Sequence, residues 1–197
     1  MKLYNFESEK IFKILNTKSR IATLSNVELS EVHKKLGELL SYKLLEEFDL
    51  EKIKINHVQG QKEGFALSSK EKFLIIVLMR AGLYVADGLK NIFDNKYSFE
   101  MVNKSDDIKE IIKKYNIENM NIIIVDSVIN TGKSIKEIID YLPNDKKIYV
   151  ASLVIQEKAI QKFENYENLY FYIARISKNF YIGKGGTDTG NRLFNLK

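Results

Sequence analysis

Three runs rich in apolar and β-branched residues constrain the fold of this chain more than any other feature. They are Phe73–Met79, Asn121–Val125 and Lys147–Ile155. The first is continuously apolar and too short for a typical helix, which favours a strand buried on both faces, as in a parallel sheet. Because helical patterns separate the runs, the sequence predicts βαβ units and an α/β fold with a mostly parallel sheet flanked by helices.

Local periodicity predicts the remaining elements. Leu29, Leu36 and Leu40 share one face of an amphipathic helix expected over residues 27–47, with Asn26 as its N-cap. Further helices are expected at 84–93, 106–115, 134–142 and 157–164, and further strands at 53–58, 97–102 and 169–173. His33 is expected on the surface of the first helix and His57 in the first of these strands, neither as a metal ligand nor as a catalyst.

The composition excludes several classes of protein. With 197 residues, 45% of them hydrophobic, the chain is expected to form one domain over residues 1–197. It has no cysteine, so disulfides and thiolate metal sites are excluded. The net charge of +5 comes mostly from lysines interleaved with acids, so no nucleic-acid partner is expected. No apolar run is long enough to span a bilayer and no secretory signal is visible, so we expect a cytoplasmic protein without a membrane partner.

The strongest motif follows the second run. Asp126 ends the expected strand, and a short loop with Thr131, Gly132 and Ser134 then opens a helix. Backbone N–H groups at such a helix start converge on one place, where the helix dipole adds positive charge. Gly132 lets the backbone approach a ligand closely. The segment is therefore typical of a phosphate-monoester site, with Asp126 placed for sugar hydroxyls or a magnesium ion.

Two enzyme families share this arrangement. The P-loop NTPases have the pattern G-x-x-x-x-G-K-[ST], which Ser127–Ser134 matches except that Ser127 replaces the first glycine. The type I phosphoribosyltransferases have an acid shortly before Thr-Gly-x-Ser, a pattern that this chain meets in full. The loop therefore resembles the phosphoribosyltransferases more closely, and a P-loop NTPase is the rival enzyme.

Two other segments fall where parallel sheets bind ligands, beyond the carboxyl ends of strands. Arg80-Ala81-Gly82 follows the first run, and its guanidinium and backbone N–H groups can clamp a pyrophosphate. A glycine-dense segment from Tyr181 to Phe194 follows the last strand. It is expected to form an adaptable loop, rather than a helix or strand, that binds a flat polar ligand.

Together these segments resemble the uracil phosphoribosyltransferase family. Met79-Arg80-Ala81-Gly82-Leu83 is similar to the family's Leu-Arg-Ala-Gly-Leu, and Ser127 is the non-acidic residue that follows its loop aspartate. The family's Tyr-Ile-x-Pro-Gly-Leu-Gly-Asp-Ala-Gly-Asp-Arg-Leu-Phe is matched at Tyr181-Ile182, Gly185, Asp188, Gly190 and Arg192-Leu193-Phe194. The resemblance implies the type I phosphoribosyltransferase fold. It also implies transfer of 5-phosphoribose from phosphoribosyl pyrophosphate (PRPP) to a nucleobase, expected to be uracil, which gives UMP and pyrophosphate in pyrimidine salvage.

The resemblance also assigns roles to residues. It makes Asp126, Arg80 and Asp188 catalytic. It implies PRPP binding by Arg80, Ala81, Gly82, Asp126, Ser127, Val128, Ile129, Asn130, Thr131, Gly132, Lys133, Ser134 and Asp188. It implies base binding by Ile182, Thr187, Asp188 and Thr189. Mg²⁺ is expected as the cofactor, carried by PRPP rather than held by direct protein ligands, and a homodimer is expected because the family commonly forms one.

Some positions depart from the family pattern. In the C-terminal motif these are Lys184, Gly186, Thr187 and Asn191. The family also has an arginine on an arm between the positions of Arg80 and Arg175, where this chain has none and Lys104 is the candidate substitute. These departures leave two alternatives open, namely another acceptor base or a non-catalytic sensor of PRPP or nucleotides.

Overall fold

A computed structural model describes residues 1–103, 107–180, 182–183 and 187–196 of the chain. Its main sheet has six strands in the order β1-β8-β7-β6-β4-β5, and every neighbouring pair is parallel. The strands are β1 (Lys2–Asn5), β4 (Phe73–Leu78), β5 (Tyr97–Val102), β6 (Asn121–Ile129), β7 (Ile148–Gln156) and β8 (Leu169–Ser177). The helices are α1 (Lys10–Ser19), α2 (Asn26–Leu45), α3 (Gly82–Leu89), α4 (Asp107–Lys114), α5 (Lys133–Ile139), α6 (Glu157–Ile160) and α7 (Thr189–Phe194). The predicted parallel sheet flanked by helices is confirmed.

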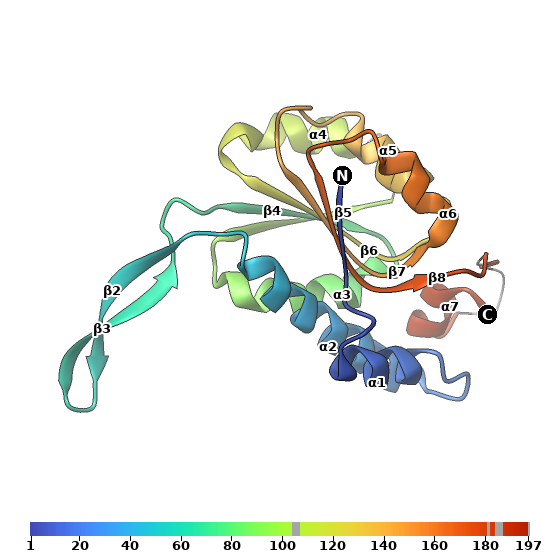
Figure 1. The fold of residues 1–197 in the computed structure, drawn as a ribbon, viewed down its shortest axis with the longest axis horizontal. Coiled ribbons are helices and arrows are strands. Elements are labelled where there is room, and N and C mark those ends of the chain that lie inside the picture. Colours follow the sequence, from blue (N-terminus) through green and yellow to red (C-terminus); the bar gives the residue numbers. More distant parts are fainter. Residues whose placement is uncertain (104–106, 181, 184–186, 197) are drawn as a thin grey trace.

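Helices cover both faces of the sheet, with α4, α5 and α6 on one side and α1, α2 and α3 on the other (Figure 1). The period of two along each strand divides the apolar side chains between two cores. In β4, Phe73, Ile75 and Val77 enter the core beneath α1–α3, while Leu74 and Ile76 enter the core beneath α4–α6. The strand is fully buried because both of its faces are covered, as its continuous apolar sequence predicts.

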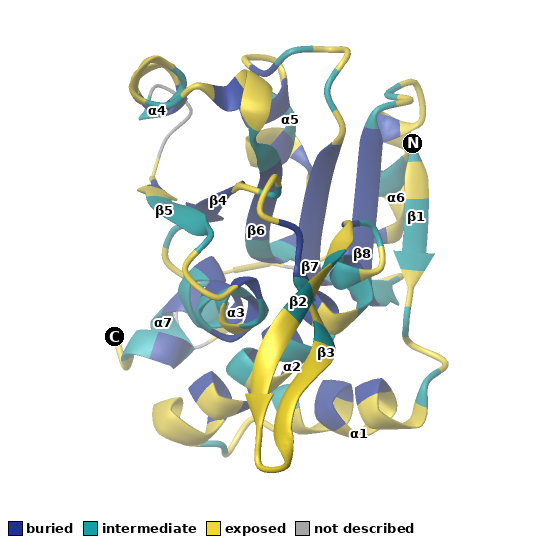
Figure 2. Cartoon of the chain, turned by 90° about the vertical axis from the view of Figure 1, so that its left-hand side faces the viewer, coloured by how far each residue is buried: buried dark blue, intermediate teal, exposed yellow. Residues whose placement is uncertain are grey.

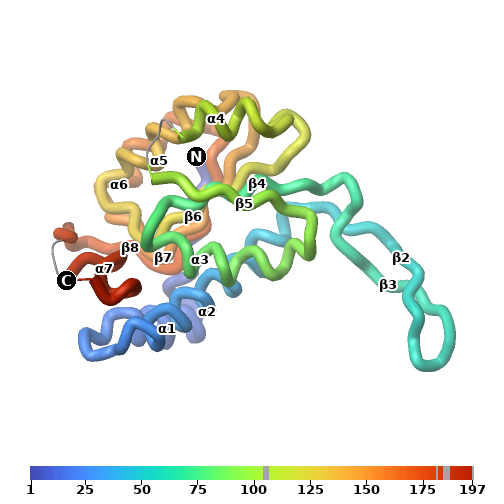
Figure 3. Tube along the Cα trace, turned by 180° about the vertical axis from the view of Figure 1, so that it is seen from behind, coloured from blue at the N-terminus to red at the C-terminus, as the bar shows by residue number. Residues whose placement is uncertain are grey.

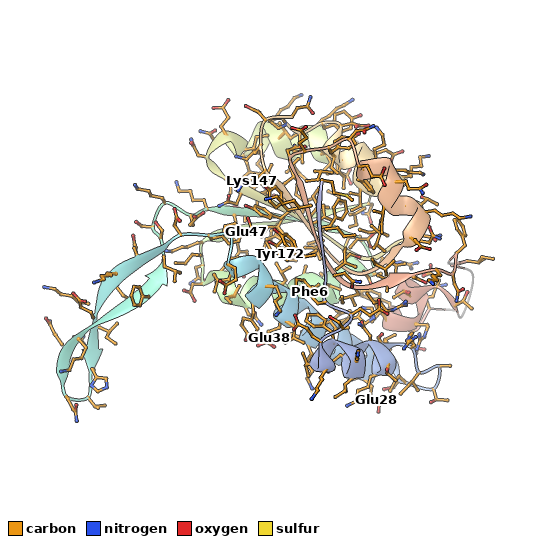
Figure 4. The ribbon with its side chains drawn as sticks, viewed as in Figure 1. Phe6, Glu28, Glu38, Glu47, Lys147 and Tyr172 are labelled. Atoms are coloured by element: carbon orange, nitrogen blue, oxygen red, sulfur yellow. The ribbon has the colours of Figure 1, made fainter. Side chains whose placement is uncertain are left out.

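The long helix α2 is fixed at both ends. Ser25, rather than the predicted Asn26, is its N-cap: Ser25 Oγ accepts a hydrogen bond from Glu28 N at 3.2 Å, and Glu28 Oε2 accepts one from Ser25 N at 2.9 Å. Beyond its C-terminus, Glu47 Oε1 accepts a hydrogen bond from Tyr172 Oη of β8 at 2.9 Å. Lys147 Nζ lies 4.0 Å from the other oxygen of the same carboxylate (Figure 4).

Helices α2 and α3 approach each other closely because each has a glycine at the contact. A Cβ atom at Gly37 would lie 2.0 Å from Val85 O, and one at Gly88 would lie 1.9 Å from Lys34 O. Neither distance leaves room for a side chain. The two glycines therefore seat α3, which follows the predicted pyrophosphate segment, directly against α2.

A hairpin of β2 (Leu50–His57) and β3 (Gly60–Leu67) projects from the body of the protein (Figure 1). The strand predicted at 53–58 belongs to this antiparallel pair and not to the main sheet. Most of the hairpin is exposed, whereas the central strands of the main sheet are buried (Figure 2). It contributes little to either core.

The C-terminal segment contains the helix α7, so the loop predicted there is wrong for Thr189–Phe194. Asp188 is the N-cap, and its Oδ1 accepts a hydrogen bond from Asn191 N at 2.8 Å. This cap starts a helix in spite of Gly190. Helix α7 lies against α2 on the side of the sheet that also carries α1 (Figure 3). Lys104, Tyr181 and Lys184 to Gly186 lie outside the described residues.

None of the helices in the described part of the chain has the length and apolar character needed to cross a membrane.

Candidate active site

Strand β6 delivers the predicted phosphate motif to the carboxyl edge of the sheet. The expectation that Asp126 ends the strand is wrong, because β6 continues to Ile129. Val128 pairs with Val154 and Ile129 pairs with Ile155 of β7. These β-branched residues extend the strand, so the turn itself begins at Asn130.

Asp126 is only partly exposed at this edge, and the protein around it changes its acidity. Burial raises the pKa of the carboxyl from its usual 3.8 to about 7, against the opposite effect of hydrogen bonds from the backbone N–H groups of Val128 and Ser127. The bond from Val128 N to Asp126 Oδ1 is 3.4 Å long. The side chain is therefore close to its titration point at neutral pH.

Asp126, Arg80 and Asp188 line one cavity of about 310 Å³. Asp126 belongs to β6, Arg80 follows β4 by two residues, and Asp188 caps α7. Arg80 follows a cis peptide bond and donates from Nη2 to Asn191 Oδ1 at 3.0 Å. The structure thus brings all three predicted catalytic residues to one place.

Gly190 is needed for this arrangement. A Cβ atom there would lie 3.1 Å from Asp188 Oδ1 and 3.5 Å from Arg80 Nε. The absence of a side chain in the first turn of α7 lets the arginine and the aspartate approach the helix backbone together.

A second cavity of about 430 Å³ adjoins the first. Val128, Asn130 and Thr189 line both cavities. The predicted site residues are distributed as follows. Arg80, Ala81, Asp126, Val128, Asn130, Asp188 and Thr189 line the smaller cavity, and Ser127, Val128, Ile129, Asn130, Thr187 and Thr189 line the larger one.

The remaining predicted residues line neither cavity. They are Gly82, Thr131, Gly132, Lys133, Ser134 and Ile182. Gly82 packs below the site, since a Cβ atom there would lie 2.9 Å from Val125 O. Ile182 is exposed, and its carbonyl oxygen accepts a hydrogen bond from Thr187 Oγ1 at 2.8 Å.

The turn before α5 is shaped by Gly132. Gly132 has a φ of 73°, in the left-handed region, and a Cβ atom there would lie 2.9 Å from the ring of Phe163. No side chain caps the start of α5, while Thr131 Oγ1 accepts a hydrogen bond from Lys133 N at 3.3 Å. Gly132 therefore lets the chain turn from β6 into α5 beside the two cavities.

His33 was expected on a helix surface, but it is buried. Only 3% of it is exposed, and its Nδ1 lies 3.3 Å from Ser127 Oγ. Burial, and secondarily the charge of Arg192, lower the pKa of the imidazole to about 4, so it is neutral near pH 7. Its position four residues after Leu29 and three before Leu36, on the apolar face of the helix, is the sequence signal that identifies its burial.

The residues present fit a magnesium ion that arrives with its substrate. In the part of the chain that the structure describes, no group of three or more histidines and carboxylates could hold a metal ion. The smaller cavity offers Asp126 and Asp188. One or two carboxylates combined with substrate phosphates are the usual ligands of such a Mg²⁺.

Comparison with known proteins agrees with this geometry. A relative from Malacoplasma penetrans named uracil phosphoribosyltransferase is 26% identical over 194 residues, which cover 92% of this chain and 93% of the relative. A relative of the same name from Thermococcus sibiricus is 22% identical and covers 98% of this chain and 90% of its own. A solved structure of a protein from Aquifex aeolicus has the same overall fold, with a TM-score of 0.72 at 20% identity over 97% of this chain and 98% of that one.

The match to a family model is as extensive as these pairwise matches. The model described as uracil phosphoribosyltransferase matches residues 6–196, which include the strand ends, the loop after β6 and the C-terminal helix. The chain therefore belongs to the uracil phosphoribosyltransferase family.

Proposed function

We propose that this chain transfers 5-phosphoribose from PRPP to uracil, forming UMP and releasing pyrophosphate. The observation that carries the proposal is the convergence of Arg80, Asp126 and Asp188 on one cavity that shares three lining residues with a second. Family membership agrees with this reaction and argues against a P-loop NTPase.

Each part of PRPP has a matching part of the site. The guanidinium of Arg80 and the backbone of Ala81 suit the pyrophosphate. Asp126 suits the ribose hydroxyls, for which a carboxylate is a strong hydrogen-bond acceptor. The backbone from Ile129 to Ser134 suits the 5′-phosphate. The acceptor base then lies at the boundary of the two cavities, beside Val128 and Thr189.

The chemistry follows from this placement. The bond from the ribose C1 to the pyrophosphate oxygen breaks, and its electron pair leaves with the pyrophosphate. A bond from C1 to the base nitrogen forms, and the proton of that nitrogen passes to the pyrophosphate or to water. Positive charge develops on the sugar, and negative charge develops on the leaving pyrophosphate close to Arg80. Bound Mg²⁺ would add positive charge at the pyrophosphate. The protein acts by orienting the reactants and by fixed charges, without a covalent intermediate.

The direct test is a pyrophosphate-release assay with PRPP, Mg²⁺ and a panel of nucleobases. We expect release that depends on uracil, with UMP as the product. Release only with another base would keep the reaction and replace the acceptor. PRPP binding without release for any base would favour the sensor alternative, and an absence of PRPP binding would disprove the proposal.

Replacing Arg80 tests the pyrophosphate subsite. We expect Arg80→Gln to lower kcat/KM for PRPP by about 10²-fold, because it removes a preorganised charge from the developing pyrophosphate. Arg80→Lys should recover only part of the loss, since an ammonium cannot form a planar fork. Steady-state kinetics on variants with an unchanged melting temperature provide the measurement. An unchanged kcat/KM for Arg80→Gln would exclude the residue from the site.

We also propose a homodimer. The projecting hairpin of β2 and β3 supports this, because the apolar side chains of Leu50, Val58 and Phe65 are exposed along it, and contact with a second copy would remove them from water. Light scattering on the purified protein should give twice the mass of the chain, and a monomeric mass would rule the dimer out.

A further inference from the structure

The larger cavity has an unusual charge for a site that takes a neutral base. Three of the four arginines of the chain line it: Arg20 directly after α1, Arg175 in β8 and Arg192 in α7. None of the described residues that line this cavity is an aspartate or a glutamate. The proposed transfer to uracil gives these three guanidinium groups no part to play.

Two of the arginines are oriented by carbonyl groups rather than by acids. Arg20 Nε donates to Asn16 O at 3.0 Å, and an Nη of Arg192 donates to Ile21 O at 2.8 Å. Among the residues that the structure describes, every salt bridge involves a lysine and none involves an arginine. A carbonyl holds a guanidinium in position but leaves its charge uncompensated.

Arg175 has the least satisfied side chain of the three. Its Nε is buried and has no hydrogen-bond partner. Burial, and then the charge of Arg20, lower the pKa of Arg175. Glu7 acts in the opposite direction, but its carboxylate accepts a hydrogen bond from Ile176 N at 3.2 Å instead of pairing with the guanidinium. The positive charges of Arg20 and Arg175 repel each other, and the buried Nε of Arg175 lacks an acceptor. Both features lower the stability of the folded state unless a ligand supplies negative oxygen atoms.

We propose that the end of the larger cavity lined by Arg20, Arg175 and Arg192 is an oxyanion subsite next to the acceptor position. Its ligand is a carboxylate or phosphate group, which matches the planar fork of an arginine with two parallel hydrogen bonds. The position beside the acceptor rests on the proposed function, whereas the arginine cluster itself does not.

The ligand group has two chemical sources. It is a carboxylate carried by the acceptor ring, or a phosphate that belongs to a separate small molecule. The exposed ring of Phe180 also lines this cavity and offers a flat surface to a heterocycle. Because the cavity is about 430 Å³, within the range of ligand pockets that hold more than a single small ring, both sources fit.

Titration calorimetry on the full chain tests the subsite with three probes: uracil, uracil-6-carboxylate and inorganic phosphate. The variant is Arg175→Gln, and Lys62→Gln on the exposed hairpin is the control with the same loss of charge. We expect at least one anionic probe to bind the unmodified protein at least tenfold more tightly than it binds Arg175→Gln. The control should match the unmodified protein, and uracil should not discriminate between the variants.

The pattern of affinities identifies the source. If uracil-6-carboxylate binds more tightly than uracil, and this difference in affinity disappears in Arg175→Gln, the subsite belongs to a carboxylate of the acceptor. If only phosphate binds the unmodified protein more tightly than Arg175→Gln, the subsite belongs to a separate anion. Arg20→Gln, at an exposed position, repeats the test if Arg175→Gln does not fold. If neither anion prefers the unmodified protein to the arginine variants, the proposal is overturned. Anion binding without UMP formation would instead disprove the proposed reaction and leave the subsite in place.

Discussion

Asp126→Asn is expected to lower kcat for UMP formation by about 10²-fold or more while the protein stays folded. The carboxylate is carried by β6 and lines the same cavity as Arg80 and Asp188. It is proposed to orient the ribose and to stabilise its developing positive charge, and removing one such fixed group typically costs about 10²–10³ in rate. Asp145→Asn, on an exposed loop, is the matched control. Equal turnover by the two variants would show that Asp126 has no catalytic role.

The acidity of Asp126 adds two expected results. Because its pKa is raised to about 7, the carboxylate forms only as the pH rises through 7, so kcat/KM for PRPP should increase over that interval in the unmodified enzyme.

The raised pKa of Asp126 also means that ionisation destabilises the folded state. The free energy of unfolding therefore falls as the pH rises from about 4 to about 7. Asp126→Asn should therefore raise the melting temperature at pH 8. A lower melting temperature would indicate a structural role.

Gly88→Ala is expected to cause the largest loss of stability among single-methyl substitutions at the helix contact. Its Cβ would lie 1.9 Å from Lys34 O, which belongs to the backbone of α2 and cannot rotate away. Overpacking of this kind costs about 3 kcal/mol of unfolding free energy. Urea denaturation should show a clearly lower midpoint.

Gly64→Ala is the control for that substitution. The nearest atom to its Cβ would be the methyl carbon Cγ2 of Ile55 at 3.2 Å, which belongs to an exposed side chain of the hairpin and needs to move by only a few tenths of an ångström. A surface change of this kind is expected to stay within about 0.5 kcal/mol. If Gly88→Ala unfolds at the same urea concentration as the control, the contact between α2 and α3 is looser than the structure indicates.

The main sheet could be predicted from the sequence because its strands are buried on both faces. Residues such as Ile123 and Ile76 stand in continuous apolar runs that few other structures accommodate. Strand β3 (Gly60–Leu67) could not be predicted, since it contains two glycines and only its last residue is buried. Helix α7 was also missed, because the cap at Asp188 and the contact of Gly190 with Arg80 outweigh the low helix propensity of glycine.

The candidate site also has a part that the sequence predicts and a part that it does not. Asp126 and Arg80 follow strands that are visible in the sequence, and the rule that ligands bind at the carboxyl ends of parallel strands places them together. The arginine cluster depends on contacts between distant segments: Arg20 follows a helix that was not predicted, and Arg192 reaches Ile21 across 171 residues of sequence. No local pattern reports such a contact.

The position of α7 has a consequence for how the protein becomes active during synthesis. Asp188 completes the smaller cavity, while Asn191 and Arg192 hold α7 to Arg80 and Ile21, which were translated much earlier. In a nascent chain, β4, β5 and β6 leave the ribosome before α7, because synthesis proceeds from the N-terminus to the C-terminus. Its site nevertheless stays open on one side until Asp188 and α7 have emerged. Catalytic competence should therefore arise only after α7 has docked, so chains that lack α7 would be inactive rather than partly active.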